Sequence, residues 1–198
     1  MVNDTPILIR RMADYDRDIR LEVADVFVDG YYKDFSVFTK DREKLKKAFK
    51  DAFSAEIFYV AEIQGDIVGI LACATSKCRG MHIEREAMKS QFGYFKGNLA
   101  FHFMKDVFNE ILSYPDDTGY IECVATSEKA RGRGVCTALV QYCMHSLPYT
   151  HLILEVLDSN LPAYRLYSKL GFSEIERKTE RFTMCKGFKE KIYMGYSK

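Results

Sequence analysis

Apolar residues recur along this chain at two spacings, one typical of strands and one typical of helices. Short apolar or alternating runs predict strands at residues 7–9, 57–63, 67–74, 120–125, 152–157, 172–184 and 192–196. Apolar residues three and four apart predict helices over 14–32 and 98–113, and helices that begin near Asp41, Val135 and Asn160. Gln64-Gly65-Asp66 predicts a hairpin turn. With 198 residues, we expect one α/β domain, 1–198.

The segment 76–113 is longer than a plain hairpin connection and contains its own predicted helix. Its apolar residues are expected to be available for burial: Leu99, Phe103, Val107, Phe108 and Ile111. Near the C-terminus, a turn-rich stretch at 185–190 separates the last two predicted strands.

A glycine-rich turn separates the strand at 120–125 from the helix that begins at Val135. Gly132 and Gly134 allow a ligand close to the backbone because no Cβ intervenes. The unpaired amides of the first helical turn face such a ligand, with the positive end of the helix dipole behind them. Arg131 and Arg133 add positive charge. The turn is therefore a candidate phosphate site, although a basic surface turn fits this segment alone equally well.

Three phosphate motifs bear on this turn. A Walker loop is excluded, because Gly-Lys-Ser/Thr is absent. The dinucleotide pattern G-x-G-x-x-G fails only at Thr137, and Glu155 lies near the place of its ribose-binding carboxylate. Two observations argue against dinucleotide binding. Residues 127–131 separate the glycines from the strand, and too few residues follow the motif to build a doubly wound sheet.

The third motif is the pyrophosphate loop Arg/Gln-x-x-Gly-x-Gly/Ala of the GNAT superfamily of N-acetyltransferases. The segment 131–136, Arg-Gly-Arg-Gly-Val-Cys, resembles this loop with one departure, Cys136 in place of Gly or Ala. Thr137 falls where the family commonly has a phosphate-binding Ser or Thr. The segment 160–172 is similar to a second family motif, N-x-x-A-x-x-L-Y-x-K-x-G-F, at every fixed position. The two motifs cover roughly the last two-fifths of the chain.

The resemblance implies the GNAT fold, an α/β (α+β) mixed sheet of about seven strands flanked by helices. Similar proteins connect the third and fourth strands more briefly, so 76–113 is interpreted as a helical insertion. In the family, two parallel strands near the middle splay apart and acetyl-CoA enters the gap. The implied function is transfer of an acetyl group from acetyl-CoA to a primary amine by direct attack in a ternary complex. An acyl-CoA-binding module without turnover is the alternative.

Two residues are candidates for the chemistry. Glu122 lies within an apolar strand, and strict alternation would place Tyr120, Glu122, Val124 and Thr126 on one face. A carboxylate there is costly unless it faces water or a partner. Glu122 is therefore either a general base, or a glutamate that is paired with an arginine or held at a wet edge of the sheet. Tyr167 lies on the inward stripe of the last helix; it is either a core tyrosine or, as its motif implies, the acid that protonates the CoA sulfur.

The resemblance also implies which residues bind acetyl-CoA. The backbone of Val124, Ala125 and Thr126 should pair with the pantetheine arm like an added strand. Asn160 can cap the last helix and can also hydrogen-bond the pantetheine, and the two roles are compatible. The complete predicted set is Val124, Ala125, Thr126, Arg131, Gly132, Arg133, Gly134, Val135, Cys136, Thr137, Asn160, Ala163 and Tyr167.

The acceptor site is less well specified. An aromatic cluster after the first helix is a candidate acceptor wall, although a core role fits it equally well. Three aromatic residues of the insertion are candidate lid residues. The two groups are Tyr31, Tyr32, Phe35 and Phe38, and Phe92, Tyr94 and Phe95. Cys136 is either a packing residue or a reactive thiol with a depressed pKa at a helix start.

Composition excludes several other classes of function. The formal net charge of +1 gives no broad electrostatic reason to bind nucleic acid or an anionic membrane. Six cysteines form no C-x-x-C pair, and four histidines show no metal-ligand spacing, so no metal or disulfide framework is expected. We expect a cytoplasmic protein that acts on a small-molecule or peptide amine, and the family resemblance allows a homodimer.

Overall fold

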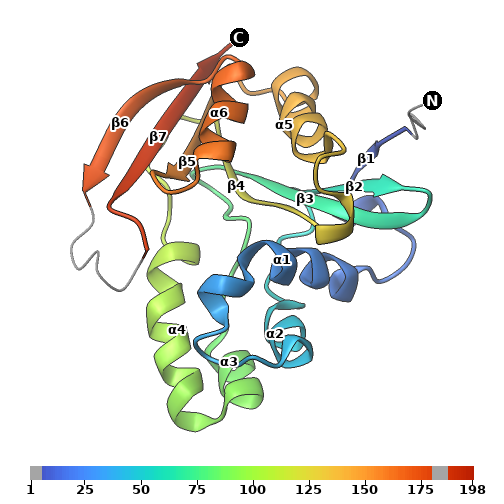
Figure 1. Cartoon of the computed structure of the whole chain (residues 1–198), viewed down its shortest axis with the longest axis vertical. Coiled ribbons are helices and arrows are strands. Elements are labelled where there is room, and N and C mark those ends of the chain that lie inside the picture. Colours follow the sequence, from blue (N-terminus) through green and yellow to red (C-terminus); the bar gives the residue numbers. More distant parts are fainter. Residues whose placement is uncertain (1–5, 180–186) are drawn as a thin grey trace.

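Seven strands form one mixed sheet in the part of the chain that the computed structural model describes, residues 6–179 and 187–198. The spatial order is β1-β2-β3-β4-β5-β7-β6, and only β4 and β5 run parallel (Figure 1). The strands are β1 (Leu8–Arg11), β2 (Phe58–Ile63), β3 (Asp66–Ala74), β4 (Thr118–Thr126), β5 (His151–Leu157), β6 (Ser173–Thr179) and β7 (Glu190–Ser197). The predicted mixed sheet is confirmed. The remainder of the strand predicted at 172–184 lies outside the described residues.

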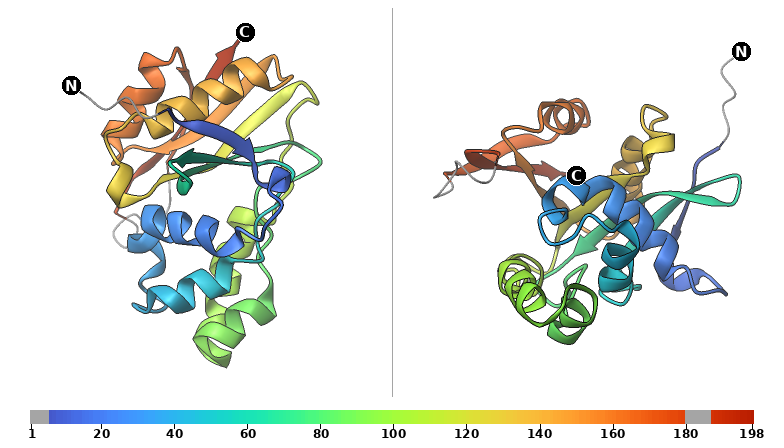
Figure 2. Two further views of the ribbon diagram at one scale, coloured as in Figure 1. Left: turned by 90° about the vertical axis from the view of Figure 1, so that its right-hand side faces the viewer. Right: turned by 60° about the horizontal axis from the view of Figure 1, so that its bottom comes forward.

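Helices cover both faces of the sheet (Figures 1 and 2). One face carries four helices: α1 (Arg20–Phe35), α2 (Arg42–Phe49), α3 (Arg85–Phe92) and α4 (Tyr94–Phe108). The other face carries α5 (Val135–Ser146) and α6 (Leu161–Lys169). Two short 3-10 turns, Met12–Asp14 and Glu128–Ala130, complete the order. The sheet is thus the middle layer between two apolar cores.

Local sequence signals explain where several elements begin. The Asp41 carboxylate caps α2 by accepting from the amides of Glu43 and Lys44, at 3.0 and 3.2 Å. The hairpin between β2 and β3 turns at Gln64 and Gly65, both with positive φ. The helix start near Asp41 and the hairpin turn were both expected from the sequence. The cap fixes where the chain enters α2, and the turn fixes the register between β2 and β3.

The parallel pair at the centre of the sheet is short. Only Thr118–Ile121 of β4 pair with β5, opposite His151–Leu154. Beyond this ladder β4 continues to Thr126 and β5 to Leu157 without pairing to each other. The two strands therefore separate from Glu122 onward, which confirms the predicted splay.

A bulge in β4 overturns the predicted alternation. Between Glu122 and Ala125, three steps along β4 oppose two steps along β3, and Cys123 has φ +56°. Cys123 and Ala125 join the core under α1, whereas Val124 packs with the core under α5. The prediction that Glu122, Val124 and Thr126 share one face is therefore wrong, because the extra residue shifts the alternation by one.

The insertion also differs from its prediction. It contains two helices, and the helix predicted at 98–113 is α4, which begins and ends earlier. Leu99, Phe103, Val107 and Ile111 are 53, 65, 52 and 76% exposed, so the expected burial is wrong for all four. Phe108 does pack against the core.

The opposite face of α4 is the one that packs. It carries Gly97, Ala100 and Met104, all buried. A Cβ on Gly97 would meet the Lys89 Cα at 2.4 Å, so the two insertion helices approach closely at this glycine. Small residues that permit this approach decide which face turns inward. The larger apolar side chains are left outside.

Candidate active site

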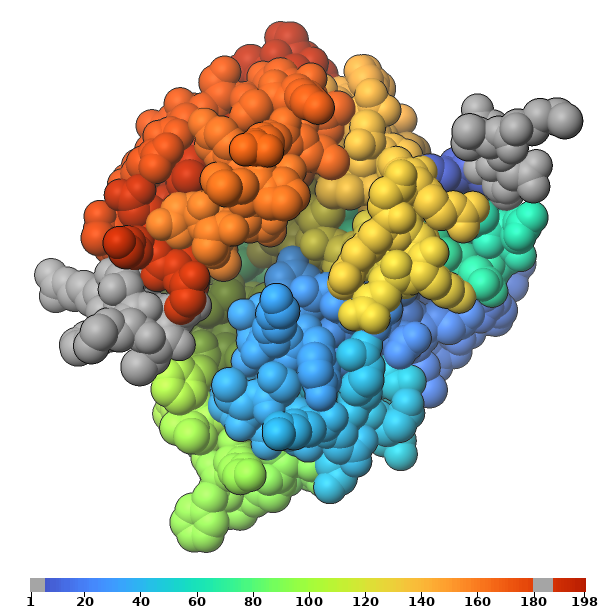
Figure 3. All heavy atoms as spheres, in the orientation of Figure 1, coloured from blue at the N-terminus to red at the C-terminus, as the bar shows by residue number. Residues whose placement is uncertain are grey.

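The end of β4 forms the floor of a hollow between α1 on one side and α5 and α6 on the other (Figure 3). Ala125 and Thr126 pair with β3 along one edge of the strand, while their other edge faces the gap left by β5. The Tyr31 hydroxyl donates to the Val124 carbonyl at 3.4 Å. Tyr31 is also where α1 departs from helical geometry, with φ −116° and ψ 16°. An open strand edge and a kinked helix thus meet at the predicted pantetheine site.

The glycine loop borders this hollow and leads into α5. Gly132 and Gly134 have φ of +77° and +79°, and a Cβ on either would meet nothing within 4 Å. Gly134 precedes the first turn of α5 without any side-chain cap. The amides of Val135, Cys136 and Thr137 therefore carry no intrahelical bond and remain available to an anion.

The two arginines of the loop differ in their contacts. Arg131 donates to the Asp29 carbonyl at 3.2 Å and lies 3.8 Å from the Glu128 carboxylate, which anchors the loop to α1. Arg133 is exposed. The loop thus combines three features that a pyrophosphate site requires. Its amides are open, its two glycines adopt the positive φ that other residues avoid, and its arginines carry positive charge.

The second motif lies on α6. The Asn160 side chain caps the helix by accepting from the Ala163 amide at 3.3 Å, so the capping interpretation is confirmed. Tyr167 is 6% exposed, and its ring lies 6.1 Å from that of Phe172. Burial, together with the neighbouring Cys136 thiol, raises the pKa of Tyr167 above its ordinary value. Its hydroxyl therefore stays protonated at neutral pH.

Cys136 and Tyr167 bring the two motifs together. Both side chains belong to the same apolar core, which joins the start of α5 to the last turn of α6. Burial raises the pKa of the Cys136 thiol to about 11, although the neighbouring Tyr167 hydroxyl acts in the opposite direction. Burial therefore favours the interpretation of Cys136 as a packing residue over that of a reactive thiol.

Glu122 is held by an arginine that the sequence did not single out. Its carboxylate accepts from Arg79 Nη2 at 2.7 Å, from Arg79 Nε at 3.3 Å and from the Gly80 amide at 2.7 Å. The two side chains are only 13 and 10% exposed. A Cβ on Gly80 would meet Glu122 Oε1 at 2.9 Å, so this position has room only for glycine. The pairing with an arginine, one of the alternatives predicted for Glu122, is what the structure shows.

Arg79 also binds the insertion. Its guanidinium donates to the carbonyls of Val107, at 2.8 Å, and Glu110, at the C-terminal end of α4. Burial acts to lower the pKa of Arg79, but the hydrogen bond and charge of Glu122 outweigh it and raise that pKa. One cation therefore connects the last carbonyls of α4 with the candidate base.

The candidate acceptor wall divides into two parts. Phe35 is buried between Phe27 and Phe49, with ring centroids 5.5 and 4.7 Å away, so it is a core residue. Tyr31 and Phe38 are only partly buried. Burial, with smaller contributions from Cys123, Tyr167 and Glu122 among others, raises the pKa of Tyr31 well above its usual range. Tyr31 therefore lies within electrostatic reach of residues on both sides of the hollow.

The aromatic residues of the insertion also divide. Phe92 stacks on Phe38 at 6.2 Å between ring centroids. Tyr94 and Phe95, in contrast, are exposed. Tyr32 turns its hydroxyl to the Lys40 carbonyl at 3.0 Å. Of the candidate lid residues, Phe92 alone has a contact with the candidate wall.

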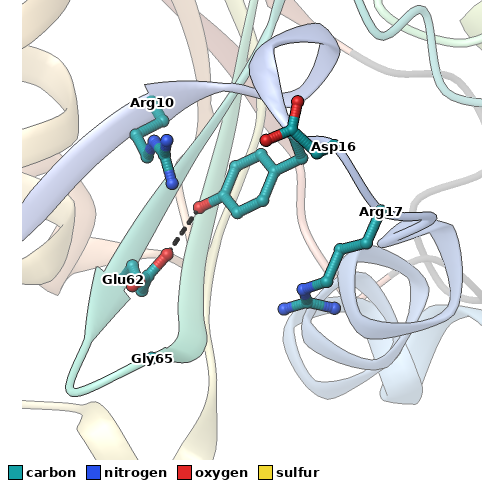
Figure 4. Close-up of a pocket in the computed structure, with 6 residues that line it drawn as sticks. Arg10, Asp16, Arg17, Glu62 and Gly65 are labelled. Carbon is teal, nitrogen blue, oxygen red and sulfur yellow. Dashed lines mark hydrogen bonds between the residues drawn. The ribbon is translucent and has the colours of Figure 1, made fainter.

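A separate pocket opens at the β1–β2 edge (Figure 4). Its polar centre is a hydrogen bond of 2.8 Å from the Tyr15 hydroxyl to Glu62. Burial and this bond raise the pKa of Tyr15 to about 12. The residues that line it are Arg10, Tyr15, Asp16, Arg17, Glu62 and Gly65. None of these residues belongs to the predicted acetyl-CoA site, so the pocket is separate from that site.

Comparison with known proteins decides the family. Residues 21–172 match the model of the acetyltransferase (GNAT) family. The chain belongs to this family. The match covers both motifs, the splayed strands and the insertion.

Individual relatives are more distant. An N-alpha-acetyltransferase of Sulfurisphaera tokodaii is 39% identical over 62 residues, which are 29% of this chain and 37% of that protein. A Pyrococcus horikoshii structure superposes with a TM-score of 0.58 at 20% identity, covering 98% of this chain and 99% of its own. The Escherichia coli ribosomal-protein-S18-alanine N-acetyltransferase gives 0.57 at 13% identity, covering 97 and 94%. At these identities the structures establish a shared fold.

Two further observations concern this GNAT chain. Within residues 6–179 and 187–198, no cluster of three or more His, Cys, Asp or Glu side chains is arranged to hold a metal ion. No helix in the same part of the chain is long and apolar enough to cross a bilayer.

Proposed function

We propose that this protein transfers the acetyl group of acetyl-CoA to a primary amine by direct attack in a ternary complex. The observation that carries the proposal is the glycine loop, whose helix-start amides are open, next to the stretch of β4 that is not paired with β5. Tyr167 is buried in the same apolar core as the start of α5 and would supply a hydroxyl to this site. The loop 131–137 would hold the pyrophosphate, and the backbone of Val124, Ala125 and Thr126 would hold the pantetheine arm.

The chemistry requires two proton movements. The amine nitrogen attacks the acetyl carbonyl carbon, the carbon–sulfur bond breaks, and the thiolate of CoA leaves. Glu122 is the proposed base that takes the proton from the amine, directly or through water, and Tyr167 is the proposed acid that gives a proton to the sulfur. The Val124 amide is the proposed donor to the carbonyl oxygen, on which negative charge develops. The Tyr167 hydroxyl can fill this role because a tyrosine is protonated near neutral pH and can donate its proton.

The hydrogen bonds of Glu122 restrict how it can act. Arg79 and Gly80 occupy both acceptor positions of Oε1, while Arg79 Nη2 occupies one position of Oε2. A carboxylate offers about four such positions, so Oε2 retains one. The proposed base therefore works through this single position on Oε2.

The proposed acceptor is a primary amine of a small molecule or peptide. Tyr31 and Phe38 would form one wall of its site, since both are only partly buried and the Tyr31 hydroxyl bonds to the Val124 carbonyl near the end of β4. The Sulfurisphaera tokodaii relative is named for acetylation of α-amines, which supports testing peptide α-amines first.

One observation favours a second candidate, an acyl-CoA-binding module of the same fold without turnover. The ion pair with Arg79 gives Glu122 a structural role that needs no catalysis. The two candidates differ in one measurable quantity, the release of free CoA thiol in the presence of amines.

The test combines an amine panel with a matched pair of variants. Wild-type protein with acetyl-CoA should release thiol with at least one amine among peptide α-amines, polyamines and amino acids. Tyr167→Phe should lower kcat about a hundredfold while acetyl-CoA affinity changes little. Tyr59→Phe, at a tyrosine that packs on the same core from β2, should leave kcat unchanged. Binding of acetyl-CoA without thiol release from any amine would establish the module instead.

A further inference from the structure

Two carboxylates lie at the same level where β4 and β5 separate, and the proposed chemistry uses only one of them. The last paired residues of the two parallel strands are Ile121 and Leu154, so Glu122 and Glu155 follow them level with one another. Ile121 and Leu154 are buried in the core under α5 and α6, so alternation turns both glutamates to the opposite face of the sheet. That face also carries Tyr31 of the candidate acceptor wall.

Three tyrosines lie around Glu155 on this face. Tyr193 is directly opposite Glu155 in the ladder between β5 and β7. Tyr120 precedes Glu122 by two residues on β4, and its ring stacks on Tyr114 with centroids 5.7 Å apart and 15° between the planes. Burial is the largest cause of a raised pKa in each of the three tyrosines, and the charge of Glu155 contributes to all of them. These four side chains, Tyr114, Tyr120, Glu155 and Tyr193, are called the tyrosine cluster below.

The hydroxyl of Tyr120 is available to a ligand. Tyr120 is only 9% exposed, yet it belongs to neither of the two apolar cores. Its hydroxyl makes no hydrogen bond to any of the described residues. Among those residues only Ser127 has a side-chain oxygen that is fully buried without a partner, so the Tyr120 hydroxyl reaches solvent. An enclosed ring thus presents an open, unpartnered hydroxyl beside Glu155.

The cations near the cluster leave Glu155 able to bind a further donor. Lys191 Nζ lies 3.2 Å from Glu155 Oε1. A carboxylate offers about four acceptor positions, so one lysine leaves others for a ligand. Lys178 lies 4.8 Å from the centre of the Tyr193 ring and 3.4 Å from the Glu176 carboxylate. The cluster therefore combines aromatic rings, a hydroxyl oxygen and a carboxylate, which are the groups that bind an ammonium ion.

We propose that the tyrosine cluster binds a second ammonium group of the acceptor, so that the preferred acceptors carry two positive charges. The inference rests on the proposed function, in which the first amine attacks beside Val124. Glu155 is level with a position two residues before Val124, and Tyr120 lies four residues before it. At about 3.3 Å per residue, these positions are roughly 7–13 Å from Val124 along the strand. A slender linear diamine spans this distance, and so does a lysine side chain next to the α-amine of a peptide.

The experiment compares acceptors that differ only in the second charge. One pair is hexamethylenediamine and aminohexanol, in which a hydroxyl replaces one ammonium group. Wild-type protein should show a kcat/KM for the diamine at least tenfold above that for aminohexanol. Glu155→Gln should reduce this preference about tenfold, since a hydrogen bond to a charged group contributes about that factor. Tyr120→Phe should reduce it several-fold.

Glu62→Gln is the matched control and should keep the wild-type preference. Glu62 is also a partly buried glutamate on a strand, and it accepts from the hydroxyl of Tyr15 at the far edge of the sheet. Rates are measured per folded, CoA-binding molecule. A change in the ratio between two acceptors is not expected from a merely structural role or from loss of the base, because either would lower both rates together.

A second pair tests the other source of the same group. It is a peptide whose second residue is Lys and the same peptide with norleucine there. A preference in one pair alone identifies the acceptor as a diamine or as a peptide. The inference is overturned if neither pair shows a preference, or if the preference survives both Glu155→Gln and Tyr120→Phe.

Direct binding separates this inference from the proposed function. The same compounds are titrated by calorimetry into protein saturated with CoA, which requires no turnover. Tighter binding of the doubly charged compound that Glu155→Gln abolishes would support the tyrosine cluster even if no thiol is ever released from acetyl-CoA. Equal binding of the charged and uncharged members of both pairs would overturn the inference even if transfer is observed.

Discussion

Glu122 shows how a single residue can be both structural and a candidate for catalysis. Its carboxylate completes a buried ion pair with Arg79, and Arg79 in turn holds the end of α4. Removing either partner leaves a buried charge without compensation and should cost about 3 kcal/mol of stability. Stability alone therefore cannot distinguish the two roles, whereas turnover by the folded protein can.

Glu122→Gln keeps the shape of the side chain and removes its basicity. We expect kcat to fall about a hundredfold near neutral pH, as for the loss of a general base, and the deficit to shrink at high pH, where more amine is already neutral. Arg79→Gln is the paired variant: it should lower the melting temperature by a similar amount and keep kcat within about tenfold. Rates are measured per folded, acetyl-CoA-binding molecule. Equal losses of kcat in both variants would assign the base elsewhere.

Cys136 should be almost inert toward alkylation at neutral pH. Burial raises the pKa of its thiol to about 11, so the thiolate, the reactive form, should be roughly 300-fold scarcer at pH 7 than for a free cysteine of pKa about 8.5. Cys78 is exposed and should react first. Mass spectrometry of peptides after iodoacetamide treatment compares the two rates. Labelling of Cys136 as fast as that of Cys78 in the folded protein would contradict the buried environment.

At the scale of elements, the glycine loop offers a test of ligand binding that is separate from backbone strain. Gly134 and Gly65 have φ of +79° and +87°, and a Cβ on either would meet nothing within 4 Å. Changing either glycine to alanine should therefore cost about 1–2 kcal/mol in the left-handed region. Only Gly134→Ala should weaken CoA binding, by about tenfold or more, because its Cβ points into the proposed pyrophosphate site. Calorimetric titration should show that the Gly65→Ala variant binds CoA with the wild-type affinity. Equal CoA affinities of the two variants would mean that the loop is only a turn and does not bind the pyrophosphate.

Elements with strong local signals were predictable, and their long-range relations were not. The cap at Asp41 and the glycines of the loop act within a few residues, so the sequence pattern indicated them. The bulge at Cys123 depends on pairing with β3, and the partner of Glu122 lies 43 residues away. For α4, the periodicity identified which apolar residues share one face of the helix, but not whether that face turns toward the core or toward solvent. That was decided by the close approach of Gly97 to α3.

At the scale of the whole molecule, ligand binding should be visible as stability. Acetyl-CoA at about 100 times its dissociation constant should stabilise the native state by roughly 2.7 kcal/mol, since it binds the folded form alone. NADH should give no shift, because the chain has the GNAT fold and lacks the doubly wound sheet of dinucleotide-binding domains. Melting curves with each ligand compare the two. A shift with NADH and none with acetyl-CoA would contradict the proposed function.

The four-residue ladder between β4 and β5 also bears on solubility. Unpaired strand edges are usually sites where sheets of different molecules join and aggregate. Here the unpaired stretch of β4 lies in the middle of the sheet, with β5, α1 and α5 around it (Figures 1 and 3). A strand from another folded protein brings its own sheet and has no room to enter, whereas a single slender extended chain does. The molecule can thus keep an open hydrogen-bonding edge permanently without offering it to its neighbours.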